Sequence, residues 1–100
     1  CWVIDGTEPG QLQLCGELYA PESGRLLTIY TTQPGVQVYT GNWLTGCPAG
    51  KNGHVYNDYD GIAIECQNYP DAPNKADYPS CVLRPGEVYE QAIIFAFGTR

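Results

Sequence analysis

Residues 31–42 read TTQPGVQVYTGN, and residues 61–74 read GIAIECQNYPDAPN. Each stretch contains a short run in which apolar and polar residues alternate, which is the period of a β-strand with one apolar face. In the second run, Glu65 lies on the face opposite Ile64, beside the small side chain of Ala63. A single carboxylate therefore stands on the polar face of an otherwise apolar strand. Whether that polar face is open to solvent or lines a binding site decides how the chain is interpreted.

The rest of the chain is divided into short segments by turn-forming Gly, Pro, Asn and Asp residues. The segments between the turns are rich in Val, Ile, Leu, Tyr and Phe, and none sustains a helical period. This pattern is typical of a sandwich or barrel of antiparallel strands. The predicted strands are residues 2–4, 11–19, 25–31, 36–39, 62–67, 81–83 and 89–97. The sequence therefore predicts an all-β fold.

Two of these strands carry expectations about burial. In residues 11–19, Leu12 and Leu14 point to one side and Cys15 to the other, so we expect one face to be buried and the other wetter. Residues 92–97 read AIIFAF without polar alternation, so this strand is expected to be covered on both faces. A few neighbouring strands supply too little surface for such cover.

Two Pro-Gly pairs predict turns. Pro34-Gly35 and Pro85-Gly86 each place a proline before a glycine that tolerates positive φ, as a type II turn requires. The segments 40–60 and 68–80 contain few apolar residues and are predicted to be long loops.

Composition restricts the class of protein. The chain has 100 residues, of which 43% are hydrophobic and 16% charged, as in an ordinary globular protein of at most one domain. It begins at Cys1 without an initiator methionine or a charged leader, so we expect residues 1–100 to be part of a longer protein.

Charge and cysteine content exclude several partners. The net charge is −6 with only five Lys and Arg residues, which argues against binding to nucleic acid or to an anionic membrane surface. No apolar run approaches the roughly 20 residues that cross a bilayer. The five cysteines are unevenly spaced, which favours reduced thiols and a cytoplasmic location over a disulfide framework or a zinc site.

Glu65 and Gln37 are the candidate functional residues. A carboxylate that is partly removed from water has a pKa closer to that of a general base. Gln37 shares a face with Tyr39, and an amide beside an aromatic ring is a common way to hold a sugar hydroxyl and its apolar face. The alternative is that both residues belong to the solvated face of an amphipathic strand.

Other chemistry-bearing residues point to ordinary surface positions. His54 is the only histidine, and it lies in a turn-rich loop with nothing to place it near Glu65. Asn57, Asp58 and Asp60 lack the ligand ladder and closing glutamate of a calcium loop. No metal site and no cofactor are predicted.

The two opening stretches resemble one known family. Residues 24–42 look like the strand pair of the aldose 1-epimerases, also called galactose mutarotases, which ends in a P-G-x-Q-x-Y-T-G-N motif. Glu65 falls where that family has the glutamate of its L-E-T-Q segment, and residues 68–89 continue the resemblance. Coverage is essentially the whole chain, and Cys66 replaces the threonine that is usual in the family.

The resemblance implies a fold and a mechanism. Residues 1–100 would be the C-terminal part of a single, large antiparallel β-sandwich of the galactose mutarotase-like type, and not an independent domain. Glu65 would act as general base on the anomeric hydroxyl of an aldose, while a histidine from an earlier segment protonates the ring oxygen. Gln37 would bind substrate hydroxyls. The partners implied are the sugar and the remaining N-terminal part of the chain, without which the fragment is expected to be inactive.

Two alternatives remain at this point. A sugar-binding or regulatory protein on the same sandwich would need hydrogen-bonding groups but no base, which the retention of Glu65 disfavours. A hexose-6-phosphate epimerase would need clustered cations, whereas Arg25, Arg84 and Arg100 are far apart in the sequence.

Overall fold

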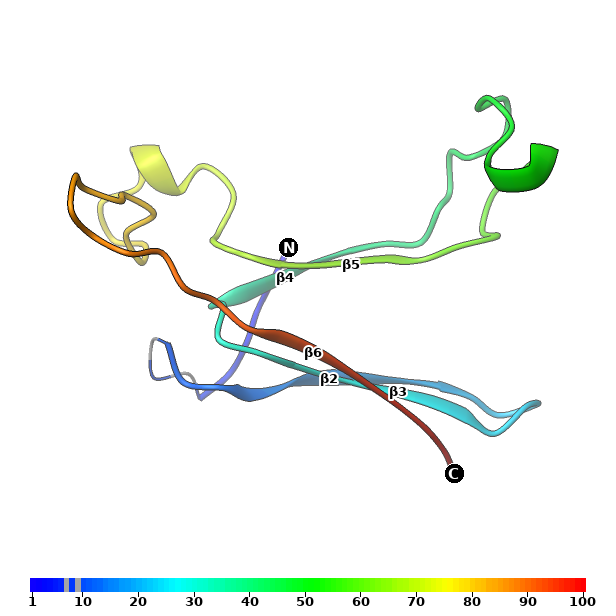
Figure 1. Cartoon of the computed structure of the whole chain (residues 1–100), viewed down its shortest axis with the longest axis horizontal. Helices are drawn as coiled ribbons and strands as arrows, with labels where there is room; N and C mark the ends of the chain where they lie inside the picture. The colour runs from blue at the N-terminus through cyan, green and yellow to red at the C-terminus, as the bar shows by residue number, and fades with distance from the viewer. Residues whose placement is uncertain (7, 9) are drawn as a thin grey trace.

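The computed structural model describes residues 1–6, 8 and 10–100 and contains two antiparallel sheets that face each other (Figure 1). The first sheet has the strand order β1-β4-β5 and is formed by β1 (Trp2–Val3), β4 (Gly35–Tyr39) and β5 (Ala63–Gln67). The second has the order β2-β3-β6 and is formed by β2 (Gln13–Ala20), β3 (Arg25–Thr31) and β6 (Ile93–Thr99). Two short 3-10 turns lie in the loops, η1 (Lys51–Gly53) and η2 (Ala72–Asn74). The predicted all-β fold is confirmed.

The core lies between the two sheets. The buried apolar residues Ile4, Ile29, Val36 and Cys66 form one cluster, with parts of both sheets represented. The partly buried residues packed against this cluster are Cys15, Leu18, Leu27 and Ile64. Since Val36 and Cys66 point into the core, the residues that alternate with them on β4 and β5 point away from it.

The chain crosses from the second sheet to the first directly after β3. Thr31 is fully buried, and its hydroxyl donates to the carbonyl of Ala92 at 3.1 Å. The same hydroxyl accepts a bond from the N–H of Gln33 at 3.1 Å. Thr32 adds a second link, because its hydroxyl accepts from the N–H of Ala92 at 2.9 Å. These bonds fix the direction in which β4 begins.

Strand β2 carries a bulge at Cys15. Leu14 pairs with Tyr30 and Gly16 pairs with Ile29, so that Cys15 is the extra residue. The side chain of Cys15 packs against the core cluster, whereas Leu14 is 54% exposed. The cysteine side of this strand is therefore the inner one.

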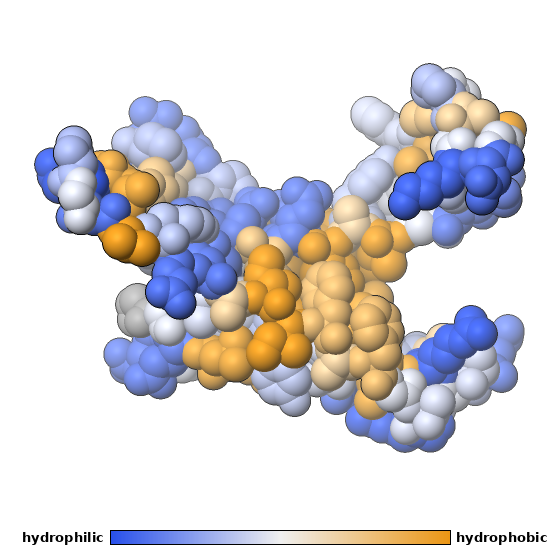
Figure 2. Space-filling model, in the orientation of Figure 1, coloured by the Kyte–Doolittle hydropathy of each residue, from blue (hydrophilic) through white to orange (hydrophobic). Residues whose placement is uncertain are grey.

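Strand β6 is an exposed edge. It pairs with β3 along its whole length. In the part of the chain that the structure describes, no other segment buries any of its residues. Figure 2 shows a broad hydrophobic area on this side of the molecule. Its exposed apolar side chains include Ile93, Ile94, Phe95 and Phe97. The cover expected from the sequence on both faces of this strand is not provided by residues 1–6, 8 and 10–100.

Three local predictions need correction. Residues 81–83 form no strand in the structure, because this short segment between Pro79 and Pro85 pairs with no neighbour. The last strand begins at Ile93, later than predicted. The Pro34-Gly35 pair forms no type II turn, since Gly35 is the first residue of β4 and is absent from the glycines with positive φ.

The second Pro-Gly pair does form the predicted turn. The N–H of Glu87 donates to the carbonyl of Arg84 at 3.0 Å, and Gly86 has a φ of 88°. This combination is that of a type II turn with glycine in its third position.

The loop between β4 and β5 is closed near its base and at a second point further out. Gly41 has a φ of 71° and accepts a bond from the N–H of Tyr59 at 2.8 Å. Further out, the N–H of Thr45 donates to the Asp58 carboxylate at 2.9 Å, and the Thr45 hydroxyl accepts from the N–H of Asp58 at 3.0 Å. The bond from the Thr45 N–H to the carboxylate, together with the Thr45 side chain, holds the pKa of Asp58 below its usual value.

We expect Gly41→Ala to destabilise the full-length protein by about 2–4 kcal/mol, measured by denaturant unfolding. A Cβ at this position would lie 2.7 Å from the carbonyl oxygen of Gly61, in a backbone conformation that already disfavours alanine. Gly46→Ala is the matched control, because Gly46 has a φ of 89° with open space around it. Its cost should be only the conformational one, about 1–2 kcal/mol. Equal losses for the two variants would contradict the close approach at the loop base.

Candidate functional site

The polar face of the first sheet is built by two strands in exact register. Gln37 of β4 lies directly opposite Glu65 of β5 in the antiparallel pair. Side chains opposite each other in such a pair have Cβ atoms about 5 Å apart on the same face. Gln37 and Glu65 therefore form a neighbouring amide and carboxylate that point away from the core.

Small residues stand diagonally beside this pair. Gly35 is opposite Gln67, and Ala63 is opposite Tyr39, all on the face of Glu65. Glu65 is exposed and Gln37 is half-buried among the described residues. The small neighbours and the exposure of Glu65 leave this carboxylate accessible from outside the sheet.

Tyrosine side chains border the face at both ends of the strand pair. A Cβ on Gly35 would lie 3.0 Å from the ring of Tyr69, so this ring covers the glycine on the polar side of the sheet. Tyr69 is held by an edge-on contact with Tyr78, with ring centroids 5.2 Å apart. At the other end, the hydroxyl of Tyr39 accepts a bond from the N–H of Trp43 at 3.0 Å.

Sequence reasoning did not identify Tyr69 as a site residue. Tyr69 follows β5 and lies in a segment that was predicted only as a loop. Gly35 offered no usable signal, because it was predicted as a turn glycine with positive φ, whereas in the structure it is a strand residue that another group approaches closely. The partner in such an approach cannot be read from local sequence.

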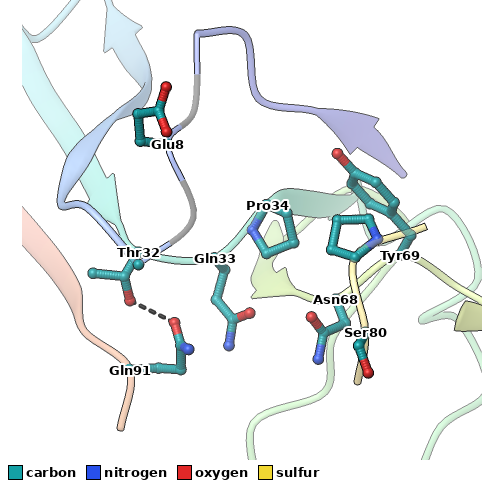
Figure 3. A pocket seen from close by; sticks show the side chains of 10 residues that line it. Glu8, Thr32, Gln33, Pro34, Asn68, Tyr69, Ser80 and Gln91 are labelled. Atoms are coloured by element: carbon teal, nitrogen blue, oxygen red, sulfur yellow. Dashed lines mark hydrogen bonds between the residues drawn. The ribbon is translucent and has the colours of Figure 1, made fainter. Parts of the chain in front are cut away.

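A cavity of about 220 Å³ lies beyond the Gly35 end of the strand pair (Figure 3). Its lining includes the uncharged polar side chains of Gln33, Asn68 and Ser80, together with the carboxylate of Glu8. The hydroxyl of Thr32 donates to the side-chain oxygen of Gln91 at 2.6 Å at its edge. Neither Gln37 nor Glu65 lines this cavity.

The remaining candidates lie elsewhere. His54 follows η1 in the protruding loop, where its ring contacts that of Tyr56 edge-on with centroids 4.6 Å apart. No three His, Cys, Asp or Glu side chains gather as possible metal ligands among residues 1–6, 8 and 10–100. Within the same residues, no helix has the length and apolar character needed to cross a membrane.

The chemistry available on the polar face is that of a base beside a hydrogen-bonding group. An ionised carboxylate accepts protons, and the neighbouring amide both donates and accepts hydrogen bonds. Tyr69 and Tyr39 add apolar ring surface, and the described face residues include no cation. Such a face is suited to a neutral, hydroxyl-rich ligand.

The fold and this face define a segment of an antiparallel β-sandwich protein with a polar outer face, and its relatives specify the family. Residues 1–96 match the family model of aldose 1-epimerase. The galactose mutarotase of Rattus norvegicus is 47% identical over 90 residues, which cover 90% of this chain and 26% of that protein. The galactose mutarotase of Homo sapiens is 51% identical over 83 residues, which cover 83% of this chain and 24% of that protein.

A bacterial relative is more distant. The aldose 1-epimerase of Escherichia coli (strain K12) is 34% identical over 87 residues, which cover 85% of this chain and 25% of that protein. The chain belongs to the aldose 1-epimerase family, as its sequence predicted. It spans about a quarter of the length of the curated relatives it matches.

The contact between Gly35 and Tyr69 can be tested by a double-mutant cycle in the full-length protein. Gly35→Ala should destabilise it by about 1–3 kcal/mol, because the new methyl group meets the Tyr69 ring. In a Tyr69→Ala background the same change should cost at least about 1 kcal/mol less. Gly98→Ala, in open space on β6, should add independently to Tyr69→Ala. Additivity of the Gly35 and Tyr69 changes would contradict the contact.

Proposed function

We propose that residues 1–100 are the C-terminal part of the catalytic domain of an aldose 1-epimerase. The complete protein would interconvert the α and β anomers of free hexoses such as galactose and glucose. The observation that carries this proposal is the register of β4 and β5, which sets Gln37 directly opposite Glu65 on a face that points away from the core. Family membership and the names of the relatives support it.

In this mechanism Glu65 is the general base. Its carboxylate removes the proton of the anomeric hydroxyl, the bond between C1 and the ring oxygen breaks, and C1 becomes an aldehyde. A general acid from the rest of the chain donates a proton to the ring oxygen. Rotation about the C1–C2 bond presents the other face of the aldehyde, and the ring closes with the two groups in exchanged roles. No metal or cofactor is needed for these proton transfers.

Gln37 is proposed to bind the substrate. Its amide has two donor protons and an acceptor oxygen, so it can hold sugar hydroxyls beside the base. A neutral sugar is preferred to a phosphorylated one, because no Lys or Arg lies among the described residues of this face. The five free cysteines are compatible with the reducing cytoplasm that we propose as the location.

The remainder of the chain is proposed to complete the sandwich. Strand β6 exposes Phe97 to 81% and leaves an unpaired edge, which is unfavourable for an isolated protein. Glu65 is likewise exposed, so a closed sugar site requires further groups on the other side of the ligand. Residues 1–100 are therefore proposed to be a dependent part of a single domain.

The role of Glu65 is tested by Glu65→Gln in the full-length protein. Polarimetry of freshly dissolved α-galactose or α-glucose should show kcat reduced by at least about 100-fold, with little change in KM. Glu90→Gln is the control, since Glu90 is an exposed carboxylate in the segment before β6. Wild-type turnover in Glu65→Gln would refute the role of the base. Sugar binding by a wild-type protein that never accelerates mutarotation would instead favour a non-catalytic sugar-binding protein.

The dependence of the segment on the rest of the chain gives a separate prediction. Residues 1–100 produced alone should leave the rate of α-glucose equilibration at its spontaneous value, because they lack an acid partner for Glu65. The full-length protein at equal concentration is the positive control. Acceleration by the isolated segment would show that these residues hold a complete active site.

A further inference from the structure

Two cysteines from different sheets meet in the core. Cys15 of β2 packs against the buried cluster that contains Cys66 of β5, so both thiols belong to the same packed group between the sheets. Cys66 is 9% exposed and Cys15 is partly exposed. The other cysteines lie outside this cluster, and Cys47 instead donates to the carbonyl of Trp43 at 3.9 Å.

The bulge in β2 explains how Cys15 reaches this position. A bulge places two residues opposite one on the neighbouring strand and changes the direction of a side chain. Here Cys15 and Gly16 share the place opposite Ile29, whose side chain belongs to the core. Gly16 has no side chain and leaves open space, since a Cβ built there would meet nothing within 4 Å. Cys15 is therefore the residue of the bulge that fills the inner face.

From this arrangement we propose that Cys15 and Cys66 are a modification site, at which a peroxide forms a disulfide that links the two sheets. Inter-sheet disulfides occur in other sandwich folds, so the architecture accommodates them. The proposal does not depend on the catalytic role of Glu65. The bond would, however, tie the strand that carries Glu65 to the opposite sheet.

The oxidation balances with hydrogen peroxide as the oxidant. Cys15 is the more accessible thiol, and its thiolate attacks one peroxide oxygen, which breaks the O–O bond and releases hydroxide. Hydroxide takes up the thiol proton as water, and Cys15 becomes a sulfenic acid. The Cys66 sulfur then attacks the Cys15 sulfur, the S–O bond breaks, and a second water leaves. Two thiols and one peroxide thus give one disulfide and two waters.

The environment makes this reaction slow near neutral pH. Burial, together with the neighbouring Cys66, raises the pKa of Cys15 to about 11, so the reactive thiolate is scarce. The pair is thereby expected to stay reduced under ordinary cytoplasmic conditions and to react under sustained oxidative exposure.

The direct test is peptide mapping of the full-length protein after exposure to hydrogen peroxide. Remaining thiols are alkylated, the protein is digested without reductant, and the peptides are identified by mass spectrometry. We expect a peptide containing Cys15 joined to one containing Cys66, lighter than the two free peptides by two hydrogens. Recovery of both as alkylated thiols, oxidation of only one, or joining of either to another cysteine would overturn the proposal.

Thermal unfolding tests whether the folded protein accommodates the bond. The disulfide closes a loop between residues 15 and 66, so Tm should rise by about 5 °C or more and return to its original value with dithiothreitol. The rise should be absent in Cys15→Ala and retained in Cys47→Ala, which removes an exposed cysteine. A lower or unchanged Tm in cross-linked protein would overturn the claim that the native sheets hold these thiols together.

Discussion

The arrangement of the two sheets depends on the buried hydroxyl of Thr31. It donates to the carbonyl of Ala92 and accepts from the N–H of Gln33, so it links β3, the crossing segment and the chain before β6. The crossing determines the residue at which β4 begins and hence which of its side chains point outward. Because side chains alternate along a strand, a shift of one residue would turn Gln37 into the core and Val36 out of it. A buried hydroxyl that is not part of the polar face thus sets the orientation of that face.

The two faces of the first sheet have different roles because of this alternation. On the inner face, Val36 and Cys66 join the apolar cluster between the sheets. On the outer face, the same strands present Gln37 and Glu65 with small neighbours beside them. The stability of the fold and the proposed chemistry are therefore carried by the same few residues of β4 and β5. A change in packing on the inner face can displace a functional group on the outer one.

The amino-acid sequence predicted the local features well and the long-range ones poorly. The bounds of β4 and β5 agree to within one residue, because alternation is a property of neighbouring residues. The Arg84–Glu87 turn was also recognisable, since proline and glycine restrict the backbone locally. Residues 81–83 were wrongly predicted as a strand, because an apolar segment becomes one only where another strand pairs with it.

Features that arise from contacts between distant segments were not predictable in the same way. The ring of Tyr69 contacts Gly35, although a long loop separates the two segments in the sequence. The sequence around either residue does not indicate which residue it contacts. The bulge at Cys15 shifts the phase of β2, so the period of the sequence alone could not decide which side of that strand is inner. The opposition of Gln37 and Glu65 rests on strand pairing as well as on alternation. The family resemblance, and not the local pattern, indicated that Gln37 and Glu65 belong to one site, but it indicated neither the Tyr69 contact nor the bulge.

The pairing of β3 with β6 has a consequence for folding kinetics. Its partners, from Thr31 with Ile93 to Arg25 with Thr99, are roughly 60 to 75 residues apart, so this ladder is among the slowest contacts for the chain to find. During that delay the free edge of β3 and the apolar residues of β6 are available to other chains. The strand topology therefore favours self-association during refolding, and a low protein concentration should improve the yield of native molecules.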